Sequence, residues 1–299
     1  MTLSEKITQL VVNDYFTPNI KAEVILDTLL TNYIAKIVKD QMGTKVGKLT
    51  FLTKEMSIEE ADTDDQDTKS DSSSEDENEG GGDDRGAKID YVLEEENGCV
   101  YLVELKTTKG SISNKQIGRY IKNCCGETFG TAMGEKLLRI IGKNYLTDKT
   151  WTVENLAIRF QTVTAGCSGT TNEERARFYL KTTGRASTNK YLYTVGQLLD
   201  HHPGSLQELW DAPLRLIYLT PDGGNVLPNS SRKKRTQEQV EAEQDFKQQW
   251  DKLYRGPNGS DSSISLKASV DTLRATGDEL ARLLAEIIEA IYLPKMEEK

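Results

Sequence analysis

The stretch KIDYVLEEENGCVYLVELK, residues 88–106, holds two strand-like runs that flank a turn. The runs Lys88–Leu93 and Val100–Lys106 are rich in Val, Ile and Tyr, which favour strands. The dipeptide Asn97-Gly98 between them is typical of a hairpin turn. We therefore predict a β-hairpin, and the charged side chains at its open end become the candidates for a site.

Three charged residues gather at that open end. Because side chains alternate along a strand, Glu104 and Lys106 project to one face and Leu105 to the other. Asp90 lies on the first strand, near the same end. Charged groups among buried apolar neighbours cost stability unless they pair or bind something. The pattern therefore indicates an ion pair or a bound cation.

A divalent cation fits these residue types. The carboxylates of Asp90 and Glu104 and the backbone carbonyl of Leu105 are hard oxygen ligands, which suit Mg²⁺ or Mn²⁺. A metal held there lowers the pKa of a bound water, and Lys106 can orient that water or offset developing negative charge. The plainer alternative is a solvent-facing ion pair between Glu104 and Lys106, worth under about 1 kcal/mol.

The register of the hairpin provides a test. A two-residue loop at Asn97-Gly98 would place Asp90 opposite Leu105, on the wrong side from Glu104. A bulge or an odd-length loop shifts the pairing by one residue and places Asp90 opposite Glu104. We predict the second arrangement, and an unbroken two-residue hairpin would count against the site.

The spacing of these residues resembles a known superfamily. Asp90, thirteen further residues and then Glu104-Leu105-Lys106 resemble the PD-(D/E)XK nucleases. The next helix carries Gln116 and Tyr120 in QIGRY, and this Q-x-x-x-Y pattern resembles the RecB-like branch of that superfamily. The i, i+4 spacing puts both side chains on one helical face. Ile89 stands where the eponymous pattern has proline.

The resemblance implies a restriction-endonuclease-like α/β core, with a central mixed sheet flanked by helices. It implies that Asp90 and Glu104 hold Mg²⁺ or Mn²⁺ and that Lys106 assists the attacking water. Gln116 and Tyr120 would orient these groups. The implied activity is hydrolysis of phosphodiesters, by preference in DNA, in a defence, restriction or mobile-element setting.

Two more segments belong to the resemblance, which covers roughly residues 15–223. Members of the superfamily commonly carry a further acid on the first helix, and Glu23 is the candidate because it continues the stripe of that helix. Asp27 is the rival candidate. The segment Tyr218–Gly223 resembles the strand and turn that close the core in several members.

The whole chain is expected to form one nuclease-like domain, residues 1–223, and a C-terminal helical extension, residues 224–299. Apolar spacing and turn residues predict, in order, a helix that starts at Thr17-Pro18 and ends before Gly43, a strand over 46–54, helices over 114–123 and 134–145, strands over 156–164 and 214–220, and helices over 236–254 and 269–293. The last helix has an apolar stripe, through which two copies of the chain could form a homodimer.

An acidic insertion accounts for the net charge of −9. Residues 57–86 hold thirteen Asp or Glu and only two basic residues, Lys69 and Arg85, so we predict a disordered loop within one domain. The rest has 36 basic and 34 acidic residues, so acidity does not exclude a nucleic-acid partner. The insertion acts either as a spacer or as a competitor for a basic groove.

Several functional classes find no support in the sequence. No apolar run approaches the roughly 20 residues that span a bilayer, and the first residues lack the layout of a signal peptide. The four cysteines have no CxxC spacing, so neither a zinc site nor a disulfide framework is indicated. We expect a cytoplasmic protein without a membrane partner.

Some alternatives stay open at this level. The basic run Ser231–Arg235 is either a phosphate-binding element or a solvated loop, and Lys106–Gly110 could also contact a phosphate. His201-His202 is expected in a loop without a metal. The same fold could bind nucleic acid or a protein without cutting it, and the substrate could be RNA.

Overall fold

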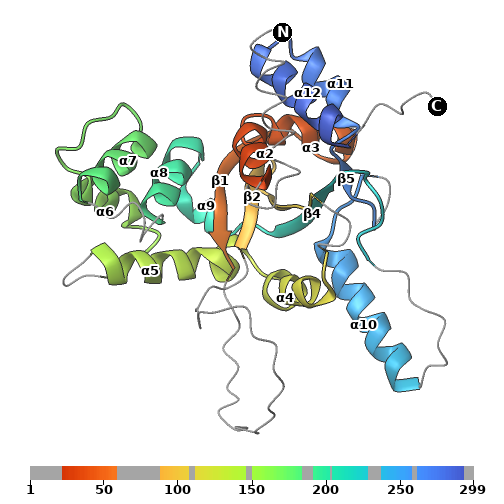
Figure 1. Ribbon diagram of the computed structural model, residues 1–299. Coiled ribbons are helices and arrows are strands. Elements are labelled where there is room, and N and C mark those ends of the chain that lie inside the picture. The colour runs from red at the N-terminus through yellow and green to blue at the C-terminus, as the bar shows by residue number, and fades with distance from the viewer. Residues whose placement is uncertain are drawn as a thin grey trace, which may run out of the picture.

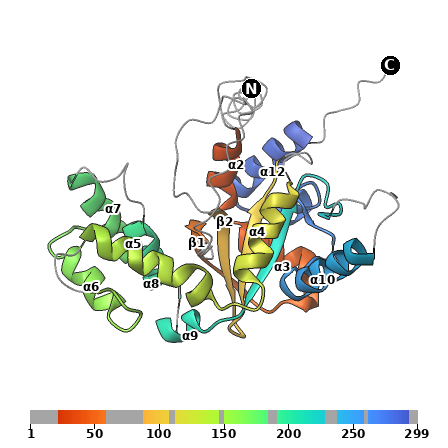
Figure 2. The same ribbon diagram turned by 90° about the horizontal axis from the view of Figure 1, so that it is seen from below.

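The computed structural model describes most of the chain between its ends, apart from the acidic insertion and several loops. The described residues are 22–58, 88–107, 112–145, 150–183, 191–202, 204–227, 237–257 and 261–292. They form a sheet with helices on both faces (Figure 1 and Figure 2). The prediction of an α/β fold with a mixed sheet is therefore confirmed.

The five strands lie in the sheet in chain order. β1 (Leu49–Ser57), β2 (Lys88–Glu95) and β3 (Val100–Leu105) pair antiparallel. β4 (Leu214–Thr220) pairs parallel with β3, and β5 (Ile264–Ser265) pairs parallel with β4. A parallel step needs a long crossover, and the helices between β3 and β4 supply it.

Alternation along the strands divides the apolar residues between two cores. On one face Leu102 and Leu216 belong to a core with residues of α4 (Asn114–Cys124). On the other face Val103 and Ile217 belong to a second core with residues of the N- and C-terminal helices. Glu104 lies two residues beyond Leu102, so alternation places it on the face that α4 covers.

Most of the described residues of the crossover are helical. After α4 come the π-helix η3, four helices and a short fifth one before β4; α5 to α8 form a helical lobe at the side of the sheet (Figure 1). Their bounds are η3 Gly130–Gly134, α5 Glu135–Tyr145, α6 Leu156–Val163, α7 Asn172–Thr182, α8 Tyr191–His201 and α9 Leu206–Trp210. Glycines at both ends of η3 allow close packing, because a Cβ on Gly134 would lie 2.5 Å from the Trp210 side chain.

The predicted strand over 156–164 is wrong, because this segment forms α6. Leu156 and Phe160, one helical turn apart, are both buried, whereas Ile158 between them is 68% exposed. A strand would place these three side chains on one face. The helix instead turns Ile158 to solvent and packs the other two into the core.

The N-terminal helix is interrupted. The described part begins with α2 (Ala22–Leu30) and continues, after a turn at residues 31–33, as α3 (Ile34–Met42) and the 3-10 turn η1 (Gly43–Lys45). The predicted end before Gly43 is confirmed, and Gly43 has a positive φ of 60°. The predicted start at Thr17-Pro18 lies outside the described residues.

The segment after residue 223 takes part in the sheet and in the second core. It contributes α10 (Gln237–Leu253), β5, α11 (Ser269–Ala275) and α12 (Glu279–Tyr292). One continuous helix over 269–293 is wrong, because Gly277 adopts a φ of 73° between α11 and α12. Leu273, Leu284 and Ile288 of the apolar stripe are buried inside the chain. These three side chains are therefore covered by other parts of the same chain, and the homodimer stays a prediction.

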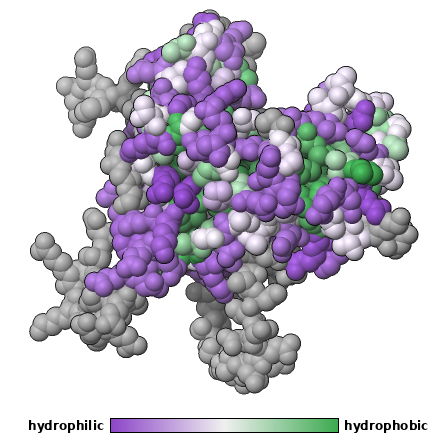
Figure 3. Space-filling model, turned by 180° about the vertical axis from the view of Figure 1, so that it is seen from behind, coloured by the Kyte–Doolittle hydropathy of each residue, from purple (hydrophilic) through white to green (hydrophobic). Residues whose placement is uncertain are grey.

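The acidic insertion begins later than predicted. Ser57 ends β1 and Ile58 is fully buried, while the rest of the predicted disordered loop lies outside the described residues. Within the described residues, no helix is long and apolar enough to cross a membrane. The rear face in Figure 3 is mostly hydrophilic, and its apolar side chains gather mainly over the helical lobe.

Candidate functional site

The hairpin adopts the register that a site requires. Tyr91 pairs with Val103 and Val92 with Leu102, so the next step along β2 brings Asp90 opposite Glu104. At the other end, the Glu95 amide donates to the carbonyl of Cys99, and Gly98 has a φ of 85°. The loop therefore has three residues, not two, and the predicted odd-length loop is confirmed.

Asp90 turns toward the neighbouring strand. Its Oδ2 accepts a hydrogen bond of 2.6 Å from the Leu105 backbone amide, where the backbone pairing of β2 and β3 ends. Across β1, the pairs Lys54–Tyr91 and Met56–Ile89 leave Glu55 opposite Asp90, and Glu55 has a φ of 53°. A positive φ in a residue other than glycine is strained and is often found at functional sites.

Glu104 is held by three donors although it is only 3% exposed. Its Oε1 accepts from Gln116 Nε2 at 2.6 Å and lies 2.8 Å from the Lys106 ammonium. Its Oε2 accepts from the Tyr120 hydroxyl at 2.6 Å. Gln116 Nε2 also lies 3.0 Å from the Tyr120 hydroxyl. These contacts fix the position and the rotation of the carboxylate.

Local sequence explains why α4 can supply two of these donors. Ser113 caps the helix by accepting from the Gln116 amide at 3.1 Å, which starts α4 at Asn114. Ile117 and Ile121 are buried and fix the rotation of the helix on the sheet. Gln116 and Tyr120, one turn apart, then both face Glu104. The predicted i, i+4 face is confirmed.

The two acids influence one another strongly. Burial and then the negative charge of Glu104 raise the pKa of Asp90 from 3.8 to about 8, against the opposing effects of the Leu105 amide and of Lys106. Burial and the charge of Glu104 also raise the pKa of Tyr120, so its hydroxyl keeps its proton and acts as a donor. A cation beside Asp90 and Glu104 would relieve their repulsion.

Of the two acids on the first helix, Asp27 can be placed relative to this cluster. Its carboxylate forms an ion pair of 2.8 Å with Lys54 of β1, and its charge contributes to the raised pKa of Asp90. Glu23 lies in α2, but its side chain is outside the described residues. Of the two acids, Asp27 is therefore the one whose contacts near the site are seen.

Sequence reasoning did not single out Tyr218 as a site residue. The parallel pairing of β3 and β4 sets it directly beside Glu104, and its ring contacts that of Tyr120 with centroids 6.4 Å apart. The alternation of LRLIYLT could have shown that Tyr218 shares a face with Leu214 and Leu216. It could not have shown which strand lies next to β4.

The donor types present fit a hard divalent cation. Among the described residues, Asp90 accepts its hydrogen bond through Oδ2 and none through Oδ1. Within the same residues there is no group of three or more His, Cys, Asp or Glu placed to hold a metal. The predicted cation site has two carboxylates and the carbonyl of Leu105 as ligands, and it stays a prediction.

Other candidates lie apart from this cluster or outside the described residues. His201 ends α8 and contacts the Leu52 carbonyl, while His202 contacts Glu94 at 2.8 Å, so both have structural partners. The basic run at 231–235 and residues 108–110 are outside the described residues.

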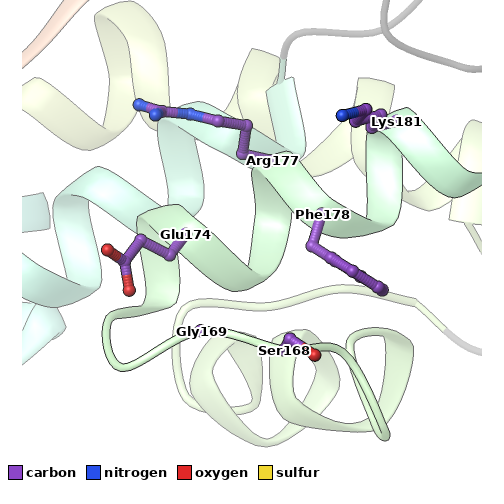
Figure 4. A pocket seen from close by; sticks show the side chains of 6 residues that line it. All are labelled: Ser168, Gly169, Glu174, Arg177, Phe178 and Lys181. Carbon is purple, nitrogen blue, oxygen red and sulfur yellow. The ribbon is translucent and has the colours of Figure 1, made fainter.

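A hollow of about 310 Å³ lies on the helical lobe, between α7 and the turn before it. Figure 4 shows the Phe178 ring directed toward the turn at Ser168 and Gly169, and the Arg177 head pointing away from it. The elements that form this hollow are not those that carry Asp90, Glu104 or Tyr120.

Comparisons of the chain with protein-family models, with curated proteins and with solved structures found no match.

Proposed function

We propose that this chain is a divalent-metal-dependent nuclease that hydrolyses phosphodiester bonds, by preference in DNA. The observation that carries the proposal is the buried Glu104 carboxylate, held by Gln116, Tyr120 and Lys106 beside a second acid. Burying several charges costs stability that well-packed apolar residues would not cost. A purely structural hairpin would have no need of them.

Each side chain has a distinct role in this proposal. Asp90 and Glu104, with the Leu105 carbonyl, would hold Mg²⁺ or Mn²⁺, which when bound supplies an activated water and stabilises charge on the phosphate. The Lys106 ammonium would donate to the attacking water or to a phosphate oxygen, because it lies 2.8 Å from Glu104 Oε1.

Gln116 and Tyr120 would keep the Glu104 carboxylate in one orientation throughout. Their hydrogen bonds of 2.6 Å come from a helix that is fixed by its own buried residues. Such support from neighbouring groups preorganises a site before substrate arrives. The side chains of α4 thus act on the carboxylate and not on the substrate.

A second candidate function is a binding module on the same fold. Both oxygens of Glu104 already have protein donors, and Asp90 with a pKa of about 8 is mostly protonated at neutral pH when no cation is present. Such a site could hold nucleic acid or a protein without cutting it. This observation favours binding over cleavage only if no divalent ion displaces the Asp90 proton and the donors on Glu104.

Cleavage assays with matched lysine variants test the proposal. The full chain is incubated with Mg²⁺ or Mn²⁺ and with plasmid, single-stranded DNA, duplex DNA or RNA. We expect Lys106→Ala to lose about 10²- to 10³-fold in kcat, as for the loss of one preorganised donor. Lys122→Ala, on the exposed face of α4, should keep the wild-type rate.

Equal rates for wild type and Lys106→Ala would end the nuclease proposal. Retention of nucleic acid without cleavage under every ion tried would favour the binding module. Cleavage confined to RNA would keep the chemistry and change the substrate.

A further inference from the structure

Tyr218 lies next to Glu104 in the sheet. The parallel register pairs Glu104 of β3 with Tyr218 of β4, so both side chains project from the same face. Tyr218 is fully buried. It therefore lies beside Glu104, on the side of β3 opposite to Asp90.

Aromatic rings surround Tyr218 on its other sides. The Tyr120 ring meets it edge-on, with centroids 6.4 Å apart. Trp250 of α10 and Tyr254, which stack on each other, have centroids at 6.4 Å and 6.1 Å from it. These contacts hold the ring in place, and a phenylalanine would make the same ones.

The hydroxyl of Tyr218 has no hydrogen-bond partner among the described residues although it is buried. A buried polar group left unsatisfied costs about 1–3 kcal/mol. The neighbouring hydroxyls of Tyr120 and Tyr254 do have acceptors, Glu104 Oε2 and the Ser262 carbonyl. Ring packing therefore does not explain why position 218 carries a tyrosine.

The parallel register sets the Glu104 carboxylate beside Tyr218 as a strong acceptor. Burial and then the charge of Glu104 raise the pKa of Tyr218, so the hydroxyl keeps its proton and can only gain by donating it in a hydrogen bond. Glu104 Oε1 is shared between Gln116 and the Lys106 ammonium. An acceptor site on that oxygen is released if Lys106 leaves.

We propose that Tyr218 is a further positioning residue of this site, whose hydroxyl donates to the Glu104 carboxylate once an anionic substrate draws the Lys106 ammonium away. The inference rests on the proposed function, because a phosphate is the anion that would recruit Lys106. Tyr218 itself touches no substrate. It replaces the donor that Glu104 loses and so keeps the carboxylate oriented during turnover.

The test compares Tyr218→Phe with Tyr254→Phe in the full chain. We expect Tyr218→Phe to lower kcat about 10- to 100-fold with KM unchanged, as for the loss of a group that supports a ligand residue. The thermal midpoint of the metal-free protein should rise or stay, because an unsatisfied hydroxyl is removed. Tyr254→Phe should keep kcat and lower the thermal midpoint, because it loses a satisfied hydrogen bond.

Two results would overturn the inference. If Tyr218→Phe keeps the wild-type kcat while wild type is active and Lys106→Ala is not, the hydroxyl has no role and the nuclease proposal stands. If Tyr218→Phe lowers kcat only in proportion to a lower thermal midpoint, the hydroxyl is structural. An inactive wild type would instead remove the nuclease proposal, and this inference with it.

Discussion

Glu95 and Glu104 are buried glutamates at opposite ends of one hairpin, and they differ in their neighbours. Glu95, near the turn, is 5% exposed and accepts from the Gly47 amide and, at 3.2 Å, from the Tyr101 hydroxyl. Glu104, at the open end, accepts from a tyrosine as well but also lies beside Lys106 and Asp90. The groups that donate to Glu95 are neutral, which suits a structural carboxylate.

The comparison teaches that burial of a carboxylate does not by itself indicate a site. Glu95 ties the loop at Gly47 to the end of the sheet, and its hydrogen bonds account for its burial. At Glu104 a second acid and a lysine share one small volume, and burial and then the charge of Glu104 raise the pKa of Asp90 to about 8. Only at Glu104 does the burial of charge carry a free-energy cost that the hydrogen bonds of the carboxylate do not offset.

The largest expected effect separates these two glutamates. Glu104→Gln should lower cleavage by about 10²-fold or more and leave the thermal midpoint near that of wild type, since the change also relieves repulsion with Asp90. Glu95→Gln should keep kcat and lose about 1–3 kcal/mol of stability. Plasmid cleavage and thermal melting measure both. A Glu104→Gln variant that unfolds like Glu95→Gln would make the two carboxylates equivalent.

The next effect is a pH dependence that belongs to the open end alone. The folded-state pKa of Asp90, about 8, lies above its ordinary value of 3.8, so the native state binds the proton more tightly. The associated stability is fully present below about pH 4 and is lost as pH rises through 8. Melting of the metal-free protein between pH 5 and 9 should show this fall.

Two variants sharpen that measurement. Asp90→Asn should flatten the fall, whereas Glu95→Gln should keep its slope at a lower midpoint. Added Mg²⁺ should stabilise the protein more at pH 8 than at pH 6, because the ion competes with the Asp90 proton. A wild-type midpoint independent of pH would contradict the coupling between Asp90 and Glu104.

A smaller effect concerns the tyrosines that serve the two glutamates. Tyr120→Phe removes a 2.6 Å bond to Glu104, and Tyr101→Phe removes a 3.2 Å bond to Glu95. A hydrogen bond to a charged group contributes about 1.5–3 kcal/mol, so both variants should melt earlier, Tyr120→Phe more so. Only Tyr120→Phe should also lower kcat. Equal losses of kcat in both would show a general loss of structure.

The smallest effect tests backbone strain at the two ends. The turn places glycine, Gly98, at its φ of 85°, whereas the open end places Glu55 at a φ of 53°. Glu55→Gly should stabilise the protein by up to about 1 kcal/mol, since strain of this kind costs on the order of 1–3 kcal/mol. Glu55→Ala, which keeps the strain, is the control. A stability loss in Glu55→Gly equal to that in Glu55→Ala would show that backbone strain at position 55 does not affect stability.

Sequence reasoning worked best where short-range spacing decides the structure. The alternation of VYLVELK placed Glu104 and Lys106 on one face, and QIGRY placed Gln116 and Tyr120 on one helical face. It failed for LAIRFQTVT, because a short apolar run fits either a strand or a helix. It also missed that Gly277 divides the last helix.

The sequence by itself determined the hairpin, the helix that follows it and the residue types that gather at the hairpin's open end. These features follow from the periods of 2 residues in a strand and 3.6 residues in a helix, which relate side chains that are close in the sequence. Only the tertiary structure decided that Tyr218 lies beside Glu104 and that Asp27 pairs with Lys54. Those contacts join segments far apart in the chain, and packing of the whole sheet against both helical layers, which no local spacing encodes, brings them together.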